Sequence, residues 1–517
     1  MYKNLKYLFI CSLFFSACSE DIEENNSGVQ SEVPVTAGTA DFSKYVALGN
    51  SLTAGYADGA LFRAGQSNSY PKLLSDQFAL AGGGTFTIPY MNDNIGGLVV
   101  GGFQIQGTRL IFNGSSPVNL PGTPTTDITS HLSGYFGNMG VPGAKSFHLL
   151  ANGYGNIAGV FSGQANPYFV RFASSASTSV IADAVAQNPT FFSLWIGNND
   201  VLSYATSGGT GINQTGNSNP ATYGSSDITD PAAFAGVYSA LLDQLTANGA
   251  KGVVANIPYV NSVPFFTTVP TNPIPGLPTA SAGQLNTLFG GINSALAGAG
   301  LPARFETLLA DDGNSATTEA NPLLIKDESL LNISSQITTA LIAAGYPAPT
   351  AGYLGNLYGQ ARHASKAADS RDYILLTAKS IIGTSQTGAP SPFNTIGVSY
   401  PMQDNTTLTA SETAEVKTAT DAYNATILSL ANSKELAFVD ANAALNQVAN
   451  GGVVFDNFHM TNDFVKGGAF GLDGVHPSAR GQAYIANKFI EAINAKYGST
   501  FRKYKAQDFP LSYPAGL

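Results

Sequence analysis

Apolar residues along the chain form two kinds of pattern, short solid runs and longer stretches with helical spacing. The short runs are YVALGN (45–50), TFFSLWIGNND (190–200), KGVVANIPYV (251–260), DYILLTA (372–378) and LAFVDA (436–441). Solid apolar runs of this length are typical of strands that are buried on both faces, as in a parallel sheet. Each run therefore predicts a strand.

Several of the intervals between these runs contain apolar residues at helical spacing. Apolar positions recur with helical spacing over 232–249, 410–433 and 481–498, and Gly498 stands where a C-cap is expected. Alternation of strand and helix favours a parallel sheet with helices packed on it. The pattern predicts an α/β fold, a three-layer α/β/α sandwich with a central, mostly parallel sheet.

Long stretches interrupt this alternation. Residues 60–135 and 204–230 are rich in Gly, Ser, Thr and Asn, whereas 262–405 combines helix-like pieces with proline-rich loops. Because structureless loops of this length are uncommon inside a domain, we expect 262–405 to form an inserted helical and loop subdomain or lid. Within it, the run 372–378 returns to the main sheet or forms a small sheet of its own. The expected core then comprises 41–261 and 406–500, followed by a C-terminal tail at 501–517.

The N-terminus has the features of an export signal. Lys3 and Lys6 precede a short apolar run, small residues and then Cys18. This arrangement predicts a signal peptide over 1–17, and its apolar run is shorter than the roughly 20 residues that a membrane span needs. The ending FSAC resembles a bacterial lipobox, and this resemblance implies a lipid on Cys18 and anchoring to the bacterial outer membrane, on either face. A plain signal peptide with an incidental cysteine is the alternative. Residues 18–40 are predicted to form a flexible acidic tether.

Composition narrows the classes of function. The chain has 517 residues, of which 44% are hydrophobic and 11% charged, with a net charge of −10. This composition supports a large folded core, and the acidic balance argues against electrostatic binding of nucleic acid. Cys11 and Cys18 are the only cysteines. Once a signal peptide is removed, Cys18 stands alone, so cysteine supplies neither an intrachain disulfide nor a nucleophile.

Two polar residues follow predicted strands at positions suited to chemistry. Ser51 comes after the first run and is a candidate nucleophile, or else a turn or helix-cap residue. Asn199 follows the second run and carries two N–H donors that can stabilise an oxyanion, or else it serves a turn. Ligands gather at the carboxyl ends of parallel strands, so we expect both side chains at one edge of the sheet.

A carboxylate and an imidazole lie close together near the C-terminus. In GLDGVHPSARG (471–481), Asp473 precedes His476 by three residues, which lets the carboxylate reach Nδ1 and leaves Nε2 free as a base. A plain Asp–His turn is the alternative. His476 is a better candidate base than the four other histidines, His131, His148, His363 and His459. In NMGVPGAKS (138–146), Gly143 can offer an unobstructed N–H to a ligand, with Gly140 as its competitor.

Taken in order, these four stretches resemble the sequence blocks of the SGNH, or GDSL, hydrolase family. The resemblance covers roughly 41–262 and 410–498. It implies an ester hydrolase in which Ser51 is the nucleophile, His476 the base and Asp473 its partner. It also implies an oxyanion hole made by the N–H groups of Ser51 and Gly143 and the side chain of Asn199, with no metal or cofactor. The substrate class stays open among lipid esters, acetylated glycans and small esters, as does the oligomeric state. No G-x-S-x-G motif occurs, which argues against the α/β-hydrolase route.

The sequence departs from the family pattern in three ways. Asn50 stands where the family usually has Asp, although an amide keeps an acceptor and gains donors. The spacing between the first two blocks is long. Finally, the insertion 262–405 is larger than in small family members. Within it, IKDESLLNIS (325–334) and RHASKAADSRDYILLTAKSIIGT (362–384) resemble pieces of longer bacterial members.

Three other functions stay open. The first is a catalytically inactive surface lipoprotein that binds glycan or protein, and the second is an acyltransferase that uses the same site. The third is a metal enzyme built on FDNFHMTND (455–463), which groups Asp456, His459 and Asp463. A polar loop is the simpler explanation of that last group.

Overall fold

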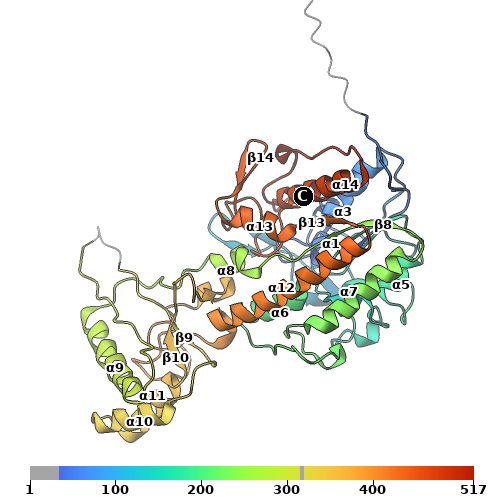
Figure 1. Cartoon of the computed structure of the whole chain (residues 1–517). Helices are drawn as coiled ribbons and strands as arrows, with labels where there is room; N and C mark the ends of the chain where they lie inside the picture. The colour runs from blue at the N-terminus through green and yellow to red at the C-terminus, as the bar shows by residue number, and fades with distance from the viewer. Residues whose placement is uncertain (1–33, 315–318) are drawn as a thin grey trace, which may run out of the picture. The chain divides into compact units, whose positions relative to one another are not determined.

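A five-stranded parallel sheet lies at the centre of the structure, a computed structural model that describes residues 34–314 and 319–517 (Figure 1). The predicted signal peptide, the lipidation site at Cys18 and most of the tether lie outside the described residues. All four strand pairs are parallel, so the predicted α/β fold with a parallel sheet is confirmed. From one edge to the other, the strands are β13 (Ala437–Val439), β8 (Lys251–Ala255), β7 (Phe191–Trp195), β1 (Tyr45–Gly49) and β6 (Asn138–Gly140).

Taken in chain order, these strands have the arrangement 2-1-3-4-5, which is common in doubly wound α/β sheets. Four of them coincide with predicted strands. The edge strand β6 was not predicted, because its three residues contain no apolar run. The predicted strand at 372–378 does not join this sheet. Residues Tyr373–Ile374 (β11) instead pair with Thr407–Leu408 (β12) in a small antiparallel ladder, the second of the two alternatives.

Helices and short 3-10 turns account for most of the remaining regular secondary structure among the described residues. The α-helices are α1 (Ser51–Ala54), α2 (Arg63–Ser67), α3 (Tyr70–Ala79), α4 (Pro167–Val170), α5 (Val180–Val185), α6 (Asn199–Thr206), α7 (Pro231–Thr246), α8 (Pro264–Thr267), α9 (Thr279–Gly298), α10 (Ser334–Ala343), α11 (Ala348–Tyr358), α12 (Ala410–Ser433), α13 (Ala441–Ala449) and α14 (Ala479–Tyr497). The 3-10 helices are η1 (Ser146–Leu149), η2 (Ile157–Gly159), η3 (Pro220–Thr222), η4 (Val260–Ser262), η5 (Leu376–Ser380), η6 (Asp404–Thr406) and η7 (Ala506–Asp508).

The three predicted helices correspond to α7, α12 and α14. The bounds of α12 are as predicted, whereas α7 ends at Thr246, three residues before Gly249. Gly498 caps α14 in the left-handed conformation, with φ of 69°, so the predicted C-cap is confirmed. No helix within the described residues is long and apolar enough to span a membrane.

Short antiparallel pairs of strands lie within the connections between the larger elements. They are β2 (Leu98–Val100) with β3 (Phe103–Gln106), β4 (Leu110–Phe112) with β5 (Pro117–Asn119), β9 (Leu324–Lys326) with β10 (Ala361–His363), and β14 (Val453–Phe455) with β15 (Phe458–Met460). The first two pairs lie in the stretch 60–135, which the composition had marked only as rich in Gly and polar residues.

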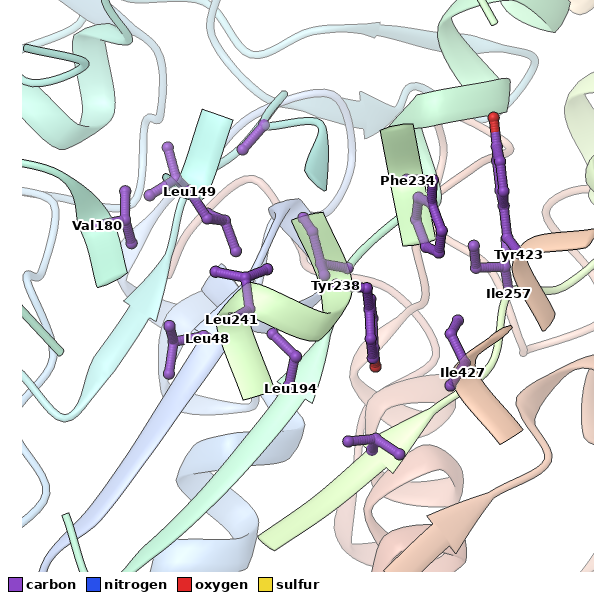
Figure 2. Close-up of a cluster of buried hydrophobic side chains, with 14 of the residues drawn as sticks. Leu48, Leu149, Val180, Leu194, Phe234, Tyr238, Leu241, Ile257, Tyr423 and Ile427 are labelled. Carbon is purple, nitrogen blue, oxygen red and sulfur yellow. The ribbon is translucent and has the colours of Figure 1, made fainter. Parts of the chain in front are cut away.

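Two hydrophobic clusters pack on the sheet because successive strand residues point to opposite faces. On β1, Val46 and Leu48 belong to one cluster, whereas Tyr45 and Ala47 belong to the other. The first cluster includes side chains of α5, α7 and α12, and Figure 2 shows Leu48 beside Leu241 of α7. The second includes side chains of α3, α13 and α14. Helices therefore contribute to both clusters.

The segment between α8 and α12 has hydrophobic clusters of its own. One of them joins α9, α10 and α11 around Phe289 and Tyr358, and another surrounds Ile325 and Met402. The contacts between residues nevertheless group all of Val35–Leu517 into one compact unit, which includes this segment. The boundaries of the predicted subdomain at 262–405 stay a prediction.

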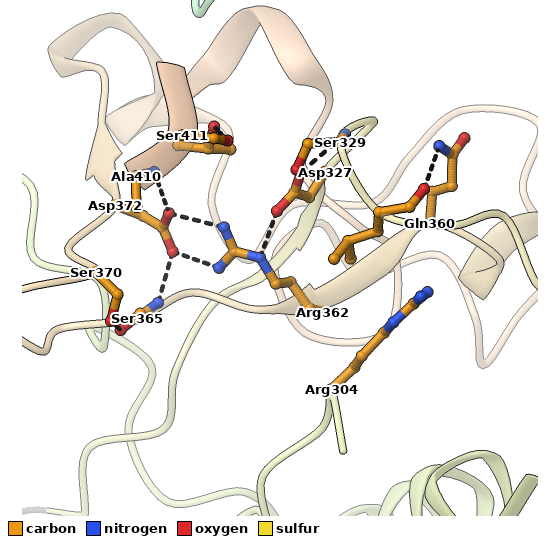
Figure 3. Close-up of polar contacts among 12 residues, drawn as sticks. Arg304, Asp327, Ser329, Gln360, Arg362, Ser365, Ser370, Asp372, Ala410 and Ser411 are labelled. Atoms are coloured by element: carbon orange, nitrogen blue, oxygen red, sulfur yellow. Dashed lines mark hydrogen bonds and ion pairs between the residues drawn. The ribbon is translucent and has the colours of Figure 1, made fainter. Parts of the chain in front are cut away.

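The partly buried guanidinium of Arg362 ties this segment to the start of α12 (Figure 3). Arg362 binds Asp372 with both terminal nitrogens, at 2.5 and 2.8 Å, and its Nε lies 2.6 Å from Asp327. Asp372 also accepts the backbone N–H of Ala410, the first residue of α12. This network gives a structural role to the stretches 325–334 and 362–384, which supply Asp327 and both Arg362 and Asp372.

Replacing Arg362 by Ala should destabilise the fold by about 3–5 kcal/mol, because it leaves two buried carboxylates without their cation. Chemical denaturation followed by circular dichroism measures the change. Lys434→Ala is the matched control, since its partner Asp243 is well exposed and such surface pairs contribute about 0–1 kcal/mol. Equal effects of the two substitutions would contradict the assigned role of Arg362.

Candidate active site

Ser51 is the first residue of helix α1 and lies immediately beyond strand β1. The side chain of Asn50 caps this helix by accepting the N–H of Leu52 at 3.0 Å. Its amide donates to Oδ1 of Asn198 at 3.2 Å, which joins the end of β1 to the end of β7. The amide side chain of Asn50 therefore acts both as an acceptor and as a donor. It holds Ser51 at the carboxyl edge of the sheet.

The three residues predicted as nucleophile, base and acid form one hydrogen-bonded chain. Ser51 Oγ lies 2.9 Å from His476 Nε2, and His476 Nδ1 lies 2.9 Å from Asp473 Oδ2. The serine and the histidine are 425 residues apart in sequence. Both distances are suited to proton transfer, and the order hydroxyl–imidazole–carboxylate is that of a serine nucleophile with its base. Tyr56 packs against the imidazole, with ring centroids 4.6 Å apart.

Backbone donors surround the carboxylate of Asp473. Its Oδ1 accepts the N–H groups of Val475 and His476, each at 2.9 Å, and its Oδ2 accepts the N–H of Gly59 at 2.8 Å. Burial alone would raise the pKa of Asp473, but His476 and the backbone donors outweigh burial and hold this pKa below its ordinary value. The carboxylate is therefore ionised at neutral pH and fixes the orientation of the imidazole.

The candidate oxyanion donors lie beyond the strands on either side of β1. Asn199 begins α6 after β7, and its amide donates to the carbonyl of Ala144 at 2.9 Å, which leaves a second amide hydrogen. Gly143 lies in the loop after β6 with φ of 81°, and its N–H forms no hydrogen bond within the described residues. The N–H of Gly140, by contrast, donates to Asn138 Oδ1. Gly143 is thus the better placed of the two glycines to offer a free N–H.

A buried carboxylate fixes the loop that carries Gly143. Asp200, the last residue of the WIGNND run, is inaccessible to solvent. It accepts the backbone N–H of Ser146 at 2.8 Å and the hydroxyl of Ser146 at 2.7 Å. Because Asp200 follows Asn199 directly, this pair of hydrogen bonds sets the spacing between the two candidate oxyanion donors.

A cavity opens beside these groups, with about 990 Å³ not filled by protein atoms, its open mouth included. Polar groups line one part of it, namely Asn50, Ser51, Asn198, Asn199 and His476. Most of the remaining wall is apolar and comes from the loop after β8, from β13 and α13, and from one face of α14.

Sequence reasoning missed Asp58, which lies seven residues after Ser51. Its side chain is 1% exposed, and Oδ1 accepts the N–H of Leu472 at 2.6 Å, in the loop that carries Asp473 and His476. Oδ2 has no hydrogen-bond partner within the described residues. Burial raises the pKa of Asp58 to about 7, despite the donor from Leu472. Nothing in the local sequence GYADG distinguishes a buried carboxyl from a turn aspartate.

The four other histidines make different contacts. His131 and His459 bind backbone carbonyls, whereas His148 and His363 accept backbone N–H groups through Nδ1. The alternative metal group does not assemble: His459 lies 2.8 Å from the carbonyl of Gly451, and Asp463 accepts the hydroxyl of Thr461. Within the described residues, these side chains do not lie close enough together to share an ion.

Comparison with models of known protein families, with curated proteins and with solved structures finds no match for this chain.

The raised pKa of Asp58 makes a testable contribution to the pH dependence of stability. Between about pH 4 and pH 7, Asp58 keeps its proton in the folded protein but loses it in the unfolded chain. The free energy of unfolding should therefore fall as the pH rises through this range. The full effect corresponds to about 4 kcal/mol. Urea denaturation at pH 5 and pH 8 should therefore show a smaller loss of stability for Asp58→Asn than for wild type. Asp76→Asn is the exposed control, and an unchanged pH dependence in Asp58→Asn would refute the assignment.

Proposed function

We propose that this protein is a serine ester hydrolase that cleaves carboxylic esters through an acyl-enzyme on Ser51. The observation that carries the proposal is the chain of two 2.9 Å contacts from Ser51 through His476 to Asp473, at the wall of a cavity. The resemblance of the four sequence stretches to the SGNH family agrees with it. An inactive binding protein would have no need for this alignment of hydroxyl, imidazole and carboxylate.

In the proposed first step, Ser51 Oγ attacks the ester carbonyl carbon while His476 Nε2 accepts the hydroxyl proton. The ionised Asp473 holds the Nδ1–H tautomer and stabilises the imidazolium that forms. The N–H groups of Ser51 and Gly143 and the free amide hydrogen of Asn199 are the proposed donors to the oxyanion. Collapse of the tetrahedral intermediate expels the alcohol, which takes its proton from His476.

The second step returns the enzyme to its starting state. Water enters, gives a proton to His476 Nε2 and attacks the acyl carbon bound to Ser51. A second tetrahedral intermediate uses the same oxyanion donors. Its collapse releases the acid and reprotonates Ser51 Oγ, so every proton transfer passes through one nitrogen of one histidine.

We also propose that the hydrolase is exported and lipid-anchored at Cys18 to the bacterial outer membrane. The support is the sequence pattern of the first 18 residues, which predicts a signal peptide with a lipobox.

Ser51→Ala should abolish labelling by a fluorophosphonate probe and lower kcat/KM for a p-nitrophenyl ester by a factor on the order of 10⁴ or more, because the nucleophile is removed. Ser335→Ala, which alters an exposed serine on α10, is the control and should behave as wild type. Equal labelling of the Ser51→Ala and wild-type proteins, or no labelling and no ester hydrolysis by wild type, would refute the proposed function.

A further inference from the structure

The cavity at Ser51 separates polar from apolar groups. Asn50, Ser51, Asn198, Asn199 and His476 form a polar group on one part of the wall, whereas the rest is dominated by aliphatic and aromatic side chains, with Lys488 as its charged member. The apolar wall includes Leu52, Trp195, Ile257, Leu445, Val448 and Ile485. A ligand that fits both parts has a polar reacting group with a hydrocarbon attached to it.

Helix α14 gives a measure of how far the apolar part extends. The residues of α14 that line the cavity are Gly481, Tyr484, Ile485, Lys488 and Phe489, which share one helical face. From Gly481 to Phe489 the helix rises by about 12 Å. An extended hydrocarbon advances by about 1.25 Å per carbon, as bonds of about 1.5 Å at tetrahedral angles require. The lined face of α14 therefore matches a chain of about eight to ten carbons.

We propose that this cavity binds the acyl chain of the substrate, and that the enzyme prefers esters of medium-chain and longer fatty acids over acetyl esters. This inference rests on the proposed function of Ser51. Each methylene buried in the apolar part should raise kcat/KM by up to about fourfold, until the cavity is filled. An acetyl group would leave nearly all of the apolar wall uncovered.

A series of p-nitrophenyl esters from acetate to dodecanoate tests this preference. In wild type, kcat/KM should rise with chain length to about eight to ten carbons and then level off. Ala444→Phe places a larger side chain on the cavity wall and should lower kcat/KM for decanoate at least tenfold more than it lowers kcat/KM for acetate. Ala443→Phe is the matched control, because the neighbouring Ala443 is exposed and does not line the cavity.

A binding measurement separates this inference from the proposed function. Trp195 is the only tryptophan in the chain and lines the cavity. In Ser51→Ala protein, 11-bromoundecanoic acid should quench its fluorescence with saturation, and adding Ala444→Phe should weaken that binding. Quenching in a protein that hydrolyses no ester would support the hydrocarbon site but refute the hydrolase. Preference for acetate together with no quenching would refute the acyl site while leaving the hydrolase intact.

A second site is indicated by three carboxyl groups far from Ser51 in sequence. One oxygen from each of Glu328, Asp404 and Glu412 lies within 4.8 Å of the others. Glu412 is 5% exposed, and its Oε1 has no hydrogen-bond partner within the described residues, like Oδ1 of Asp404. Oε2 of Glu412 accepts the N–H and hydroxyl of Thr409 at the start of α12. Burial and the neighbouring Glu328 raise the pKa values of both Asp404 and Glu412.

We infer that Glu328, Asp404 and Glu412 bind a divalent cation, and that the cation is Ca²⁺. Carboxylate oxygens are the preferred ligands of this ion, and two oxygens on one Ca²⁺, each at about 2.4 Å, are at most about 4.8 Å apart. Mg²⁺ has shorter bonds and demands a stricter geometry. A cation would give the unpartnered oxygens of Asp404 and Glu412 a ligand and would offset the repulsion among the three groups.

Thermal unfolding with CaCl₂ and with EDTA tests this site in the whole protein. Ca²⁺ near 100 times its Kd should raise the Tm of wild type by a few degrees, and Mg²⁺ should raise it less. Asp404→Asn and Glu412→Gln should each abolish most of the Ca²⁺ effect, and Gln at 412 can still accept the N–H of Thr409. Asp311→Asn, in another acidic group, is the control and should keep the wild-type response. An unchanged Tm of wild type in Ca²⁺, or an equal rise in all variants, would refute the site.

Discussion

The register of three parallel strands is the constraint on which the candidate active site depends. Gly49 at the end of β1 is paired with Gly140 on β6 and with Trp195 on β7. Because parallel strands run in one direction, the residues that follow these three positions emerge at the same edge of the sheet. Ser51, Gly143 and Asn199 each lie within four residues of that line. A shift of one residue in either pairing would also exchange the faces of the strand and bury the wrong side chains.

The acid and the base reach this edge by a different route. They come from the loop before α14, and this loop is fixed to the segment after Ser51 by two hydrogen bonds, from Gly59 to Asp473 and from Leu472 to Asp58. In both contacts a backbone N–H of one segment donates to a side-chain carboxylate of the other. The carboxylate of Asp473, held in this way, in turn orients the imidazole. The contact with Leu472 also holds Asp58 at a buried position, where burial favours the neutral form of its carboxyl.

Much of the core was predictable because its signals are local. Helix α12 has the predicted bounds 410–433, and the end of α14 is marked by Gly498. Strand β6 was missed because Met139 is its only large apolar residue; its pairing with β1 comes from tertiary context. The acid–base pair could be predicted because Asp473 and His476 are three residues apart, and contact at this spacing depends only on a local turn. Asp58 gave no such signal, because its burial depends on the loop near residue 472.

The cavity and the carboxyl cluster could not be read from the sequence, because each is assembled from segments far apart in the chain. Helix α12 links the two regions. At its first turn, Asp372 accepts the N–H of Ala410 and is paired with Arg362 (Figure 3). In the same turn, Glu412 accepts the N–H of Thr409 and lies close to the carboxyls of Glu328 and Asp404.

Both acids gain from the positive end of the helix dipole, but only Asp372 has a cation beside it. The capping contacts of Glu412 do not offset its burial and the neighbouring Glu328, so its pKa is raised. Further along α12, Asn424 binds the backbone N–H and carbonyl of Ile257, whose side chain lines the cavity. The carboxyl cluster at the first turn and the contact of Asn424 with Ile257 at the cavity wall thus lie on one continuous helix, α12, away from the reacting groups.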